Sequence, residues 1–407
     1  MKDFLHRYFW QNLSREFRRS LLFTATRSLA PSISPDAGPC EPIIVAGAFK
    51  TASGLGQSAR LCYEAFRACG VQVYGIDLTS ALRQPIDYPD YHLADGRGVA
   101  GPGTLILHVN SPFVPLALLM LGRPVTQGKW TIGYWHWELP RATAEWRHGV
   151  SRVHEIWTPS HFTAAAMMPI SDGKPIRILP HPVALGYQLP PHRPGASDGS
   201  MTALMVFNMA SGFERKNPLA AIAAFKAAFG SDPKAQMVIK VVHAECYPVG
   251  HRALLEATGS IPNVTLIDRM IDEAAMKSLY DRTDVVMSLH RSEGFGLVVA
   301  EAMLSGLPAL STNWSSTTDF LTPSTGVPVG YKLVPAIDPQ ASYHDPSQLW
   351  AEADVEDAAA KLIGLRDPAL RQDIGEAAQA AAVRMFSPQT YVDQAFTWIR
   401  RSASGQP

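Results

Sequence analysis

Apolar runs of strand length alternate with helix-length stretches along most of this 407-residue chain. This alternation is typical of stacked βαβ units, in which parallel strands share a sheet and the connecting helices cover its faces. We therefore predict an α/β fold built on parallel sheets. The expected strands are Ile43–Gly47, Val71–Asp77, Thr104–Val109, Trp130–Trp135, Glu155–Thr158, Ala203–Asn208, Met237–Val242, Val264–Ile267, Val285–Leu289 and Ala309–Thr312.

The length of the chain favours two domains, because one hydrophobic core rarely serves more than about 250–300 residues. A polar stretch with proline and glycine, Pro190–Ser200, divides the expected strands into two series. We expect a ligand site between the domains, where the carboxyl ends of parallel strands point. The predicted parts are an N-terminal segment and linker at 1–40, Rossmann-like domains at 41–195 and 196–385, and a closing helix with a tail at 386–407.

The composition argues against several classes of partner and location. The 36 Lys and Arg residues balance 36 Asp and Glu residues, so net charge gives no reason to expect nucleic acid binding. The four cysteines lack the spacing of a zinc site or a C-x-x-C pair, which suits a reducing compartment. No apolar run reaches the 18 residues of a membrane-spanning helix, and the N-terminus lacks the apolar core of a signal peptide. We predict a cytoplasmic protein.

Residues 1–30 combine six Lys or Arg residues with large apolar side chains such as Phe9, Trp10 and Phe17. At helical spacing the apolar side chains share one broad face flanked by arginines, which is typical of a helix on an anionic membrane surface. One interpretation is peripheral contact with the inner leaflet of a membrane. The other is an appendage packed on the first domain, and the sequence leaves both open.

The segment 284–313 indicates function most directly. It combines an apolar strand, a glycine-rich turn and a helix, so unpaired N–H groups at the start of the helix would face the cleft, where they favour a phosphate or sugar hydroxyl groups. Gly294 and Gly296 would let a ligand approach the backbone. Glu293 and Glu301 can present their carboxylates to two different hydroxyl-bearing parts of one ligand.

Two further loops place ionisable groups at the ends of expected strands. Arg215 and Lys216 follow one strand, and both can reach an anion such as a diphosphate. His136 and Glu138 lie in the aromatic stretch Tyr134–Pro140, which suits a sugar with apolar faces and polar edges, although a buried aromatic cluster is the rival interpretation. No Asp-x-Asp triplet is present, so we predict no metal and no cofactor.

The run Glu293-Gly-Phe-Gly-Leu-Val-Val-Ala-Glu301-Ala-Met resembles glycosyltransferase family 4, retaining enzymes of the GT-B fold. The resemblance implies two Rossmann-like domains facing each other across a cleft, with a C-terminal helix that crosses back to the first domain. It also implies that Glu301 binds the nucleotide ribose and that Glu293 contacts the donor sugar. Lys216 matches the basic position of the family, whereas Ser211 replaces its usual arginine and leaves Arg215 as the candidate substitute.

The resemblance completes the set of candidate site residues. The donor-binding candidates are Arg215, Lys216, Glu293, Gly294, Phe295, Gly296, Leu297, Glu301 and two residues of an N-terminal glycine loop, Gly54 and Gly56. The catalytic candidates are Glu293, His136 and Lys216, and the acceptor-binding candidates are Glu138, Ser160 and His181.

The implied activity is transfer of a sugar from a nucleoside-diphosphate sugar to an acceptor hydroxyl, with retained anomeric configuration. The chain looks most like bacterial mannosyl- or rhamnosyltransferases of surface-polysaccharide synthesis, so GDP-mannose is the first expectation for the donor and a saccharide or lipid-linked saccharide for the acceptor. Two alternatives stay open. GT-B folds also serve sugar-nucleotide 2-epimerases and phosphorylases, and a non-catalytic scaffold of a polysaccharide assembly complex would need neither Glu293 nor Lys216.

Overall fold

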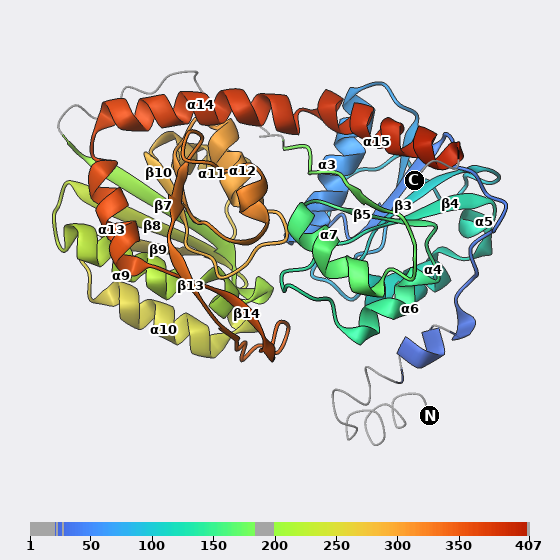
Figure 1. Cartoon of the computed structure of the whole chain (residues 1–407), viewed down its shortest axis with the longest axis horizontal. Coiled ribbons are helices and arrows are strands. Elements are labelled where there is room, and N and C mark those ends of the chain that lie inside the picture. Colours follow the sequence, from blue (N-terminus) through green and yellow to red (C-terminus); the bar gives the residue numbers. More distant parts are fainter. Residues whose placement is uncertain (1–20, 22, 27, 184–198, 405–407) are drawn as a thin grey trace.

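The computed structural model describes residues 21–404 except 22, 27 and 184–198, and contains two parallel six-stranded sheets that lie side by side (Figure 1). The sheet of the first domain has the strand order β2-β1-β3-β4-β5-β6. Its strands are β1 (Ile43–Gly47), β2 (Val73–Asp77), β3 (Gly103–His108), β4 (Lys129–Tyr134), β5 (Glu155–Thr158) and β6 (Ile176–Ile178).

The sheet of the second domain has the strand order β12-β11-β10-β7-β8-β9. Its central strands β10 and β7 carry the loops with the most functional candidates at their carboxyl ends. The strands are β7 (Met201–Asn208), β8 (Ala235–Val242), β9 (Val264–Asp268), β10 (Val285–Ser288), β11 (Ala309–Thr312) and β12 (Val327–Val329).

Helices cover these sheets. The first domain contains α3 (Gly54–Ala68), α4 (Val114–Leu121), α5 (Arg123–Thr126), α6 (Arg147–Val150) and α7 (His161–Met167). The second domain contains α8 (Phe213–Lys216), α9 (Pro218–Phe229), α10 (Pro248–Gly259), α11 (Glu273–Asp281), α12 (Leu297–Leu304) and α13 (Val355–Gly364). The chain ends with α14 (Pro368–Phe386) and α15 (Pro388–Ala403).

The central strands are buried on both faces, which explains why they are continuous apolar runs. Every residue of β1, β3 and β5 is buried. Parallel strands flanked by helices on both sides need apolar side chains at successive positions, because neither face meets water. The predicted α/β fold with two parallel sheets is therefore confirmed.

The last two helices join the domains. Figure 1 shows α14 along the second domain and α15 over the first, where α15 packs against α3. Tyr391, Val392 and Ile399 of α15 belong to the same buried cluster as Phe66 of α3. Ser387 begins α15 by accepting a hydrogen bond from the Thr390 N–H group, with proline at the first helical position.

A β-hairpin that the sequence analysis did not predict links the domains at a second place. Its strands, β13 (Tyr331–Ala336) and β14 (Asp345–Ala353), pair antiparallel and lie low between the two domains in Figure 1. Trp350 and Ala336 of the hairpin are buried within the main apolar cluster of the first domain, which includes Trp137.

Two sequence-based expectations need qualification. Helix α3 begins at Gly54, so the predicted glycine loop forms its first turn rather than a loop before a helix at Ser58. The predicted amphipathic helix at 1–30 lies mostly outside the described residues. In the described part of it, Phe23 is buried with its ring centre 5.4 Å from that of Phe113. None of the helices in the described part of the chain is long and apolar enough to cross a membrane.

Candidate functional site

The turn before α12 leaves the N-terminus of this helix without a side-chain cap. Gly296 is the N-cap of α12 with φ of 96°, a conformation that side chains rarely adopt. A Cβ atom on Gly296 would also lie 2.5 Å from Thr317 Cγ2, so only glycine fits. The N-cap offers no side-chain hydrogen bond, which leaves N–H groups of the first turn to bind an anion or hydroxyl groups.

The carboxylate of Glu293 lies between two cations. Arg215 Nη1 is 3.0 Å from Glu293 Oε2, and Lys216 Nζ is 2.5 Å from Glu293 Oε1. The Glu293 and Arg215 side chains are buried, and Lys216 is 18% exposed. Burial would raise the pKa of Glu293, but Lys216 and Arg215 lower it to about 2. Glu293 is therefore an ionised and weakly basic carboxylate at neutral pH.

Arg215 uses its donors within the protein. Its Nε and Nη2 groups donate to the carbonyl of Ser211, at 3.2 and 2.8 Å, and Nη1 donates to the carbonyl of Ser292 at 2.8 Å as well as to Glu293. Ser211, which stands at the family's arginine position, thus supplies a backbone anchor for Arg215. Among the residues that the structure describes, Glu293 is the one side-chain partner of the Lys216 ammonium group, and Lys216 is the more accessible of the two cations.

The first domain adds a second carboxylate to this cluster, Glu138. Its Oε1 atom lies 3.5 Å from the position of a Cβ atom on Gly294, and the Trp137 carbonyl is 3.3 Å from the same position. Burial raises the pKa of Glu138. The charge of Arg215 lowers this pKa, the charge of Glu293 raises it, and a hydrogen bond with Tyr343 lowers it. Both domains therefore meet at the turn before α12.

Glu301 lies in α12 and is protonated far more readily than an ordinary glutamate. Burial raises the pKa of Glu301 to about 7, against the effect of a hydrogen bond from Tyr280, whose hydroxyl is 3.4 Å from Oε2. The nearby cations of the Glu293 cluster contribute nothing to this shift. A ligand hydroxyl that donates to the Glu301 carboxylate would favour its ionised form.

His136 ends a chain of hydrogen bonds in the first domain. Burial lowers the pKa of His136 to about 3 and the pKa of His181 well below its ordinary value, so both rings are neutral. Tyr134 donates its hydroxyl to the Leu179 carbonyl at 2.5 Å and is 3.3 Å from His181 Nδ1. His181 Nε2 is 2.7 Å from His136 Nε2.

This pattern assigns the tautomers of the two histidines. Because the Tyr134 hydrogen is used, His181 Nδ1 donates to Tyr134 and His181 Nε2 accepts from His136 Nε2. His136 Nδ1 is then an acceptor, and it is a buried atom without a hydrogen-bond partner among the described residues. A sugar hydroxyl is a suitable donor for such an atom.

The remaining candidates differ in the contacts that they make within the fold. Gly56 is required by packing, because a Cβ atom would lie 2.5 Å from the Thr51 carbonyl, whereas Gly54 is exposed with open space around it. Ser160 caps α7 and donates to the Gly294 carbonyl at 2.8 Å, so it supports the turn before α12. Phe295 is buried, with its ring centre 5.0 Å from that of His181. Leu297 is the first residue of α12 and is partly buried.

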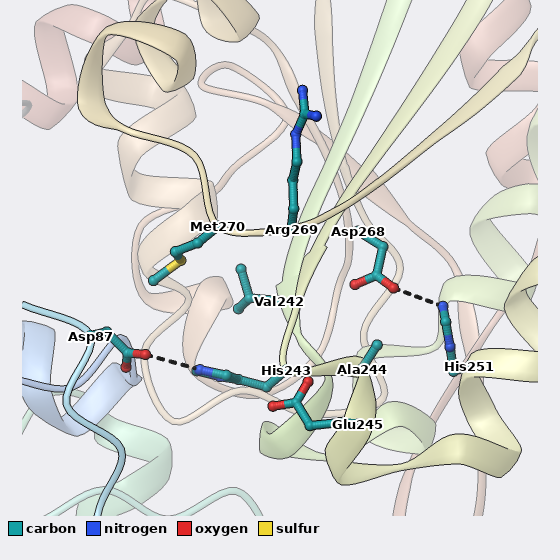
Figure 2. Close-up of a pocket in the computed structure, with 9 residues that line it drawn as sticks. All are labelled: Asp87, Val242, His243, Ala244, Glu245, His251, Asp268, Arg269 and Met270. Carbon is teal, nitrogen blue, oxygen red and sulfur yellow. Dashed lines mark hydrogen bonds and ion pairs between the residues drawn. The ribbon is translucent and has the colours of Figure 1, made fainter.

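A cavity of about 520 Å³ opens between the domains at the carboxyl ends of β8 and β9 (Figure 2). Asp87 reaches it from the first domain, and its Oδ1 atom is 3.3 Å from His243 Nε2. Asp87 also accepts from the Ala52 N–H group at 2.6 Å and so fixes the entrance to α3. The lining residues are Asp87, Val242, His243, Ala244, Glu245, His251, Asp268, Arg269 and Met270.

The structure brings most of the predicted residues together and adds others. Glu293, Lys216, Arg215 and Glu138 form one cluster, although they come from α8 and from two loops in different domains. Asp87, His243 and Tyr343 were missed, because isolated Asp, His and Tyr residues in loops carry no motif. In the described residues, no group of three or more His, Cys, Asp or Glu side chains is arranged to hold a metal ion.

The comparisons with known proteins agree on fold and family. Residues 160–382 match the family described as "Family 4 Glycosyltransferase in conflict systems". TarM of S. aureus shares 13% identity over 73% of this chain, with a TM-score of 0.56, and this chain spans 55% of the TarM chain. No match was found among curated protein sequences.

Two other solved structures match over nearly their full length. Sucrose-phosphate synthase of Thermosynechococcus elongatus is 16% identical to this chain, with a TM-score of 0.60. The match covers 90% of this chain and 100% of the synthase chain. A glycosyltransferase of Rickettsia africae is 13% identical, with coverages of 88% and 97% and a TM-score of 0.61. The fold is therefore the GT-B fold. Because the family match spans more than half of the sequence, the chain belongs to the family 4 glycosyltransferases.

The raised pKa of Glu301 predicts a pH-dependent stability. The folded pKa of about 7 exceeds the ordinary value of 4.5, so the folded state holds more protons between these values and stability falls as pH rises from about 4.5 to 7. A rise of the pKa from 4.5 to about 7 corresponds to roughly 3 kcal/mol at most. We expect Glu301→Gln to lose this decline in chemical denaturation between pH 5 and 8. Exposed Glu256→Gln is the control, and parallel curves for Glu301→Gln and wild type would contradict the assignment.

Proposed function

We propose that this protein transfers a sugar from a nucleoside-diphosphate sugar to an acceptor hydroxyl with retention of anomeric configuration. The observation that carries the proposal is the buried pairing of Glu293 with Arg215 and Lys216 beside the N-terminus of α12. Cations, helix N–H groups and a fixed carboxylate at one point form an arrangement that can hold a diphosphate and orient the sugar attached to it.

The two cations divide the work. Arg215 is anchored by the Ser211 and Ser292 carbonyls, so it keeps Glu293 in place. Lys216 can exchange Glu293 for a phosphate oxygen, because Glu293 is its one side-chain partner in the described part of the chain and part of its surface is accessible. In this proposal Lys216 and the α12 N–H groups stabilise the charge that develops on the leaving diphosphate.

Glu293 suits an orienting role better than that of a nucleophile. A carboxylate with a pKa of about 2 that already accepts from two cations has little basicity left for attack on a sugar carbon. His136 Nδ1 offers the complementary contact from the first domain, as an acceptor for a sugar hydroxyl. We assign the ribose hydroxyls of the donor to Glu301, because donation by a hydroxyl would compensate for its burial.

The cavity supports a guanine nucleotide as donor. Asp87, Glu245 and Asp268 bring three carboxylates to its walls, and ionised carboxylates only accept hydrogen bonds. Guanine presents two adjacent N–H donor groups that one carboxylate can accept together, whereas uracil has a single N–H group between two carbonyl oxygens. GDP-mannose is therefore the proposed donor, with a saccharide or lipid-linked saccharide of bacterial surface polysaccharide as acceptor.

A uridine nucleotide is the second candidate, favoured by structures of the same fold. TarM of S. aureus was solved with UDP, and HepE of Anabaena with UDP and glucose. HepE shares 11% identity with this chain at a TM-score of 0.56, so the likeness concerns the fold. The nature of the base is best tested by direct binding.

We expect GDP to stabilise the protein more than UDP, TDP or ADP do in thermal unfolding. A ligand present at a hundred times its dissociation constant adds about 2.7 kcal/mol of stability. The variant Glu245→Gln should weaken the effect of GDP more than that of UDP, because guanine can donate two N–H groups to one carboxylate and uracil only one. Stronger stabilisation by UDP than by GDP in the wild-type protein would exclude the proposed base.

We expect Lys216→Ala to lower the rate of nucleoside-diphosphate release from the sugar nucleotide by about 100-fold or more, since a charge-stabilising donor is lost. Lys226→Ala, an exposed lysine of α9, is the matched control and should keep the wild-type rate. Release is measured by coupled assay with and without a saccharide acceptor. Full activity of the Lys216→Ala variant would contradict the role that we assign to this cluster.

A further inference from the structure

The loop at the tip of the β13–β14 hairpin is rigidly organised. Its centre is Asp338, a buried carboxylate that accepts hydrogen bonds from the N–H groups of Gln340, Ser342 and Tyr343 at 2.9 to 3.0 Å. His344 Nδ1 accepts from the Asp338 N–H group at 3.2 Å. These bonds fix the backbone from which the Tyr343 side chain projects.

The same loop is fastened to the second domain next to Arg215. Gln340 accepts from the Phe213 N–H group at 2.6 Å and donates to the Met209 carbonyl at 3.0 Å. Both partners flank Gly212, where the Tyr343 ring lies 3.5 Å from the position of a Cβ atom. The hairpin therefore holds Tyr343 in a fixed position against α8, the helix that carries Arg215 and Lys216.

Tyr343 touches both domains at the candidate site. Its ring lies over the guanidinium of Arg215, with Arg215 Cζ 5.2 Å from the ring centre, and its ring centre is 5.5 Å from that of Trp137. Its hydroxyl faces the carboxylate of Glu138, which belongs to the first domain, and favours the ionised form of that carboxylate.

The base of the hairpin is tied to both domains as well. Gln348 accepts from the Arg141 N–H group at 2.7 Å and donates to the Arg141 carbonyl at 3.1 Å, which links β14 to the first domain. Glu352 accepts from Arg291 Nε at 2.7 Å, which links it to the loop that carries Glu293. The hairpin is thus bonded to both domains, and Figure 1 shows it between them.

We propose that Tyr343 is a positioning residue that holds the Glu138 carboxylate beside Arg215 and Lys216 and so sets the charge that the donor diphosphate meets. This inference rests on the proposed function and adds a residue to it. Arg215, Lys216, Glu293 and Tyr343 are the titratable groups that face Glu138. With Glu138 ionised, the two cations are balanced by two carboxylates, and a proton on Glu138 leaves the cluster one unit more positive.

Loss of the Tyr343 hydroxyl has a definite direction of effect. Burial raises the pKa of Glu138 and the bond from Tyr343 lowers it, so Tyr343→Phe should raise this pKa further. Glu138 would then take up its proton at a higher pH. Because the proton removes a negative charge next to the diphosphate, nucleotide affinity should rise on acidification at a higher pH than in the wild-type protein.

The test measures the dissociation constant of GDP, or of UDP if GDP does not bind, by calorimetry between pH 5 and 8. Four proteins are compared with the wild type: Tyr343→Phe, Glu138→Gln, the double variant, and Tyr331→Phe as a control on the same hairpin. Ionisation of the ligand itself affects all of these proteins equally. The ratio of each dissociation constant to that of Glu138→Gln therefore reports the ionisation of Glu138. We expect Tyr343→Phe to bind the nucleotide about threefold more tightly than the wild-type protein in part of this pH range. The double variant should bind no more tightly than Glu138→Gln does.

Three outcomes would overturn the inference: a Tyr343→Phe profile that superimposes on the wild type, an equal change at every pH, or the same shift in the Glu138→Gln background. If no nucleotide binds the wild-type protein, the proposed function fails by itself. The positioning of Glu138 is then judged by the thermal unfolding of the same variants. Stability effects of Tyr343→Phe and Glu138→Gln that are not additive support the positioning role, and additive effects contradict it.

Discussion

The ion pairs of Glu293 with Arg215 and Lys216 are the constraint on which the rest of the site depends. A carboxylate and two cations are costly to bury, and they are tolerated only where each charge has partners at short distance. Removal of one member of such a group leaves an uncompensated buried charge and typically costs about 3–5 kcal/mol. The fold meets this requirement by placing the loops after β7 and β10, two neighbouring strands, next to each other.

Contacts across the cleft complete the cluster. Ser160 holds the Gly294 carbonyl, Glu138 adds its carboxylate and Asn208 donates to the Ala52 carbonyl at 2.9 Å. The helix α15 and the β13–β14 hairpin bind the first domain at two separate places. A diphosphate that displaces Glu293 from Lys216 would therefore change contacts in both domains, which is a physical basis for coupling donor binding to the arrangement of the cleft.

Local spacing explains which parts could be predicted from the sequence. The buried strands are continuous apolar runs, and Glu293 and Glu301 stand on either side of a glycine turn. The strands and the two glutamates could therefore be predicted without knowledge of the tertiary structure. Tyr343 and the pairing of His136 with His181 depend on contacts between distant segments. The hairpin was not predicted either, because a two-stranded sheet has only marginal stability by itself. Its prolines and the docking of Trp350 also leave no alternation of apolar and polar residues along the strands.

The central claim is that the cation cluster and the α12 terminus recognise a diphosphate. Calorimetric titration of guanosine, GMP and GDP against the wild-type protein at one pH and ionic strength measures the contribution of each phosphate while the base and ribose stay the same. The account predicts that GDP binds at least about tenfold more tightly than guanosine, because each charge-assisted contact contributes roughly 1.5–3 kcal/mol. Equal affinities for guanosine and GDP would contradict it.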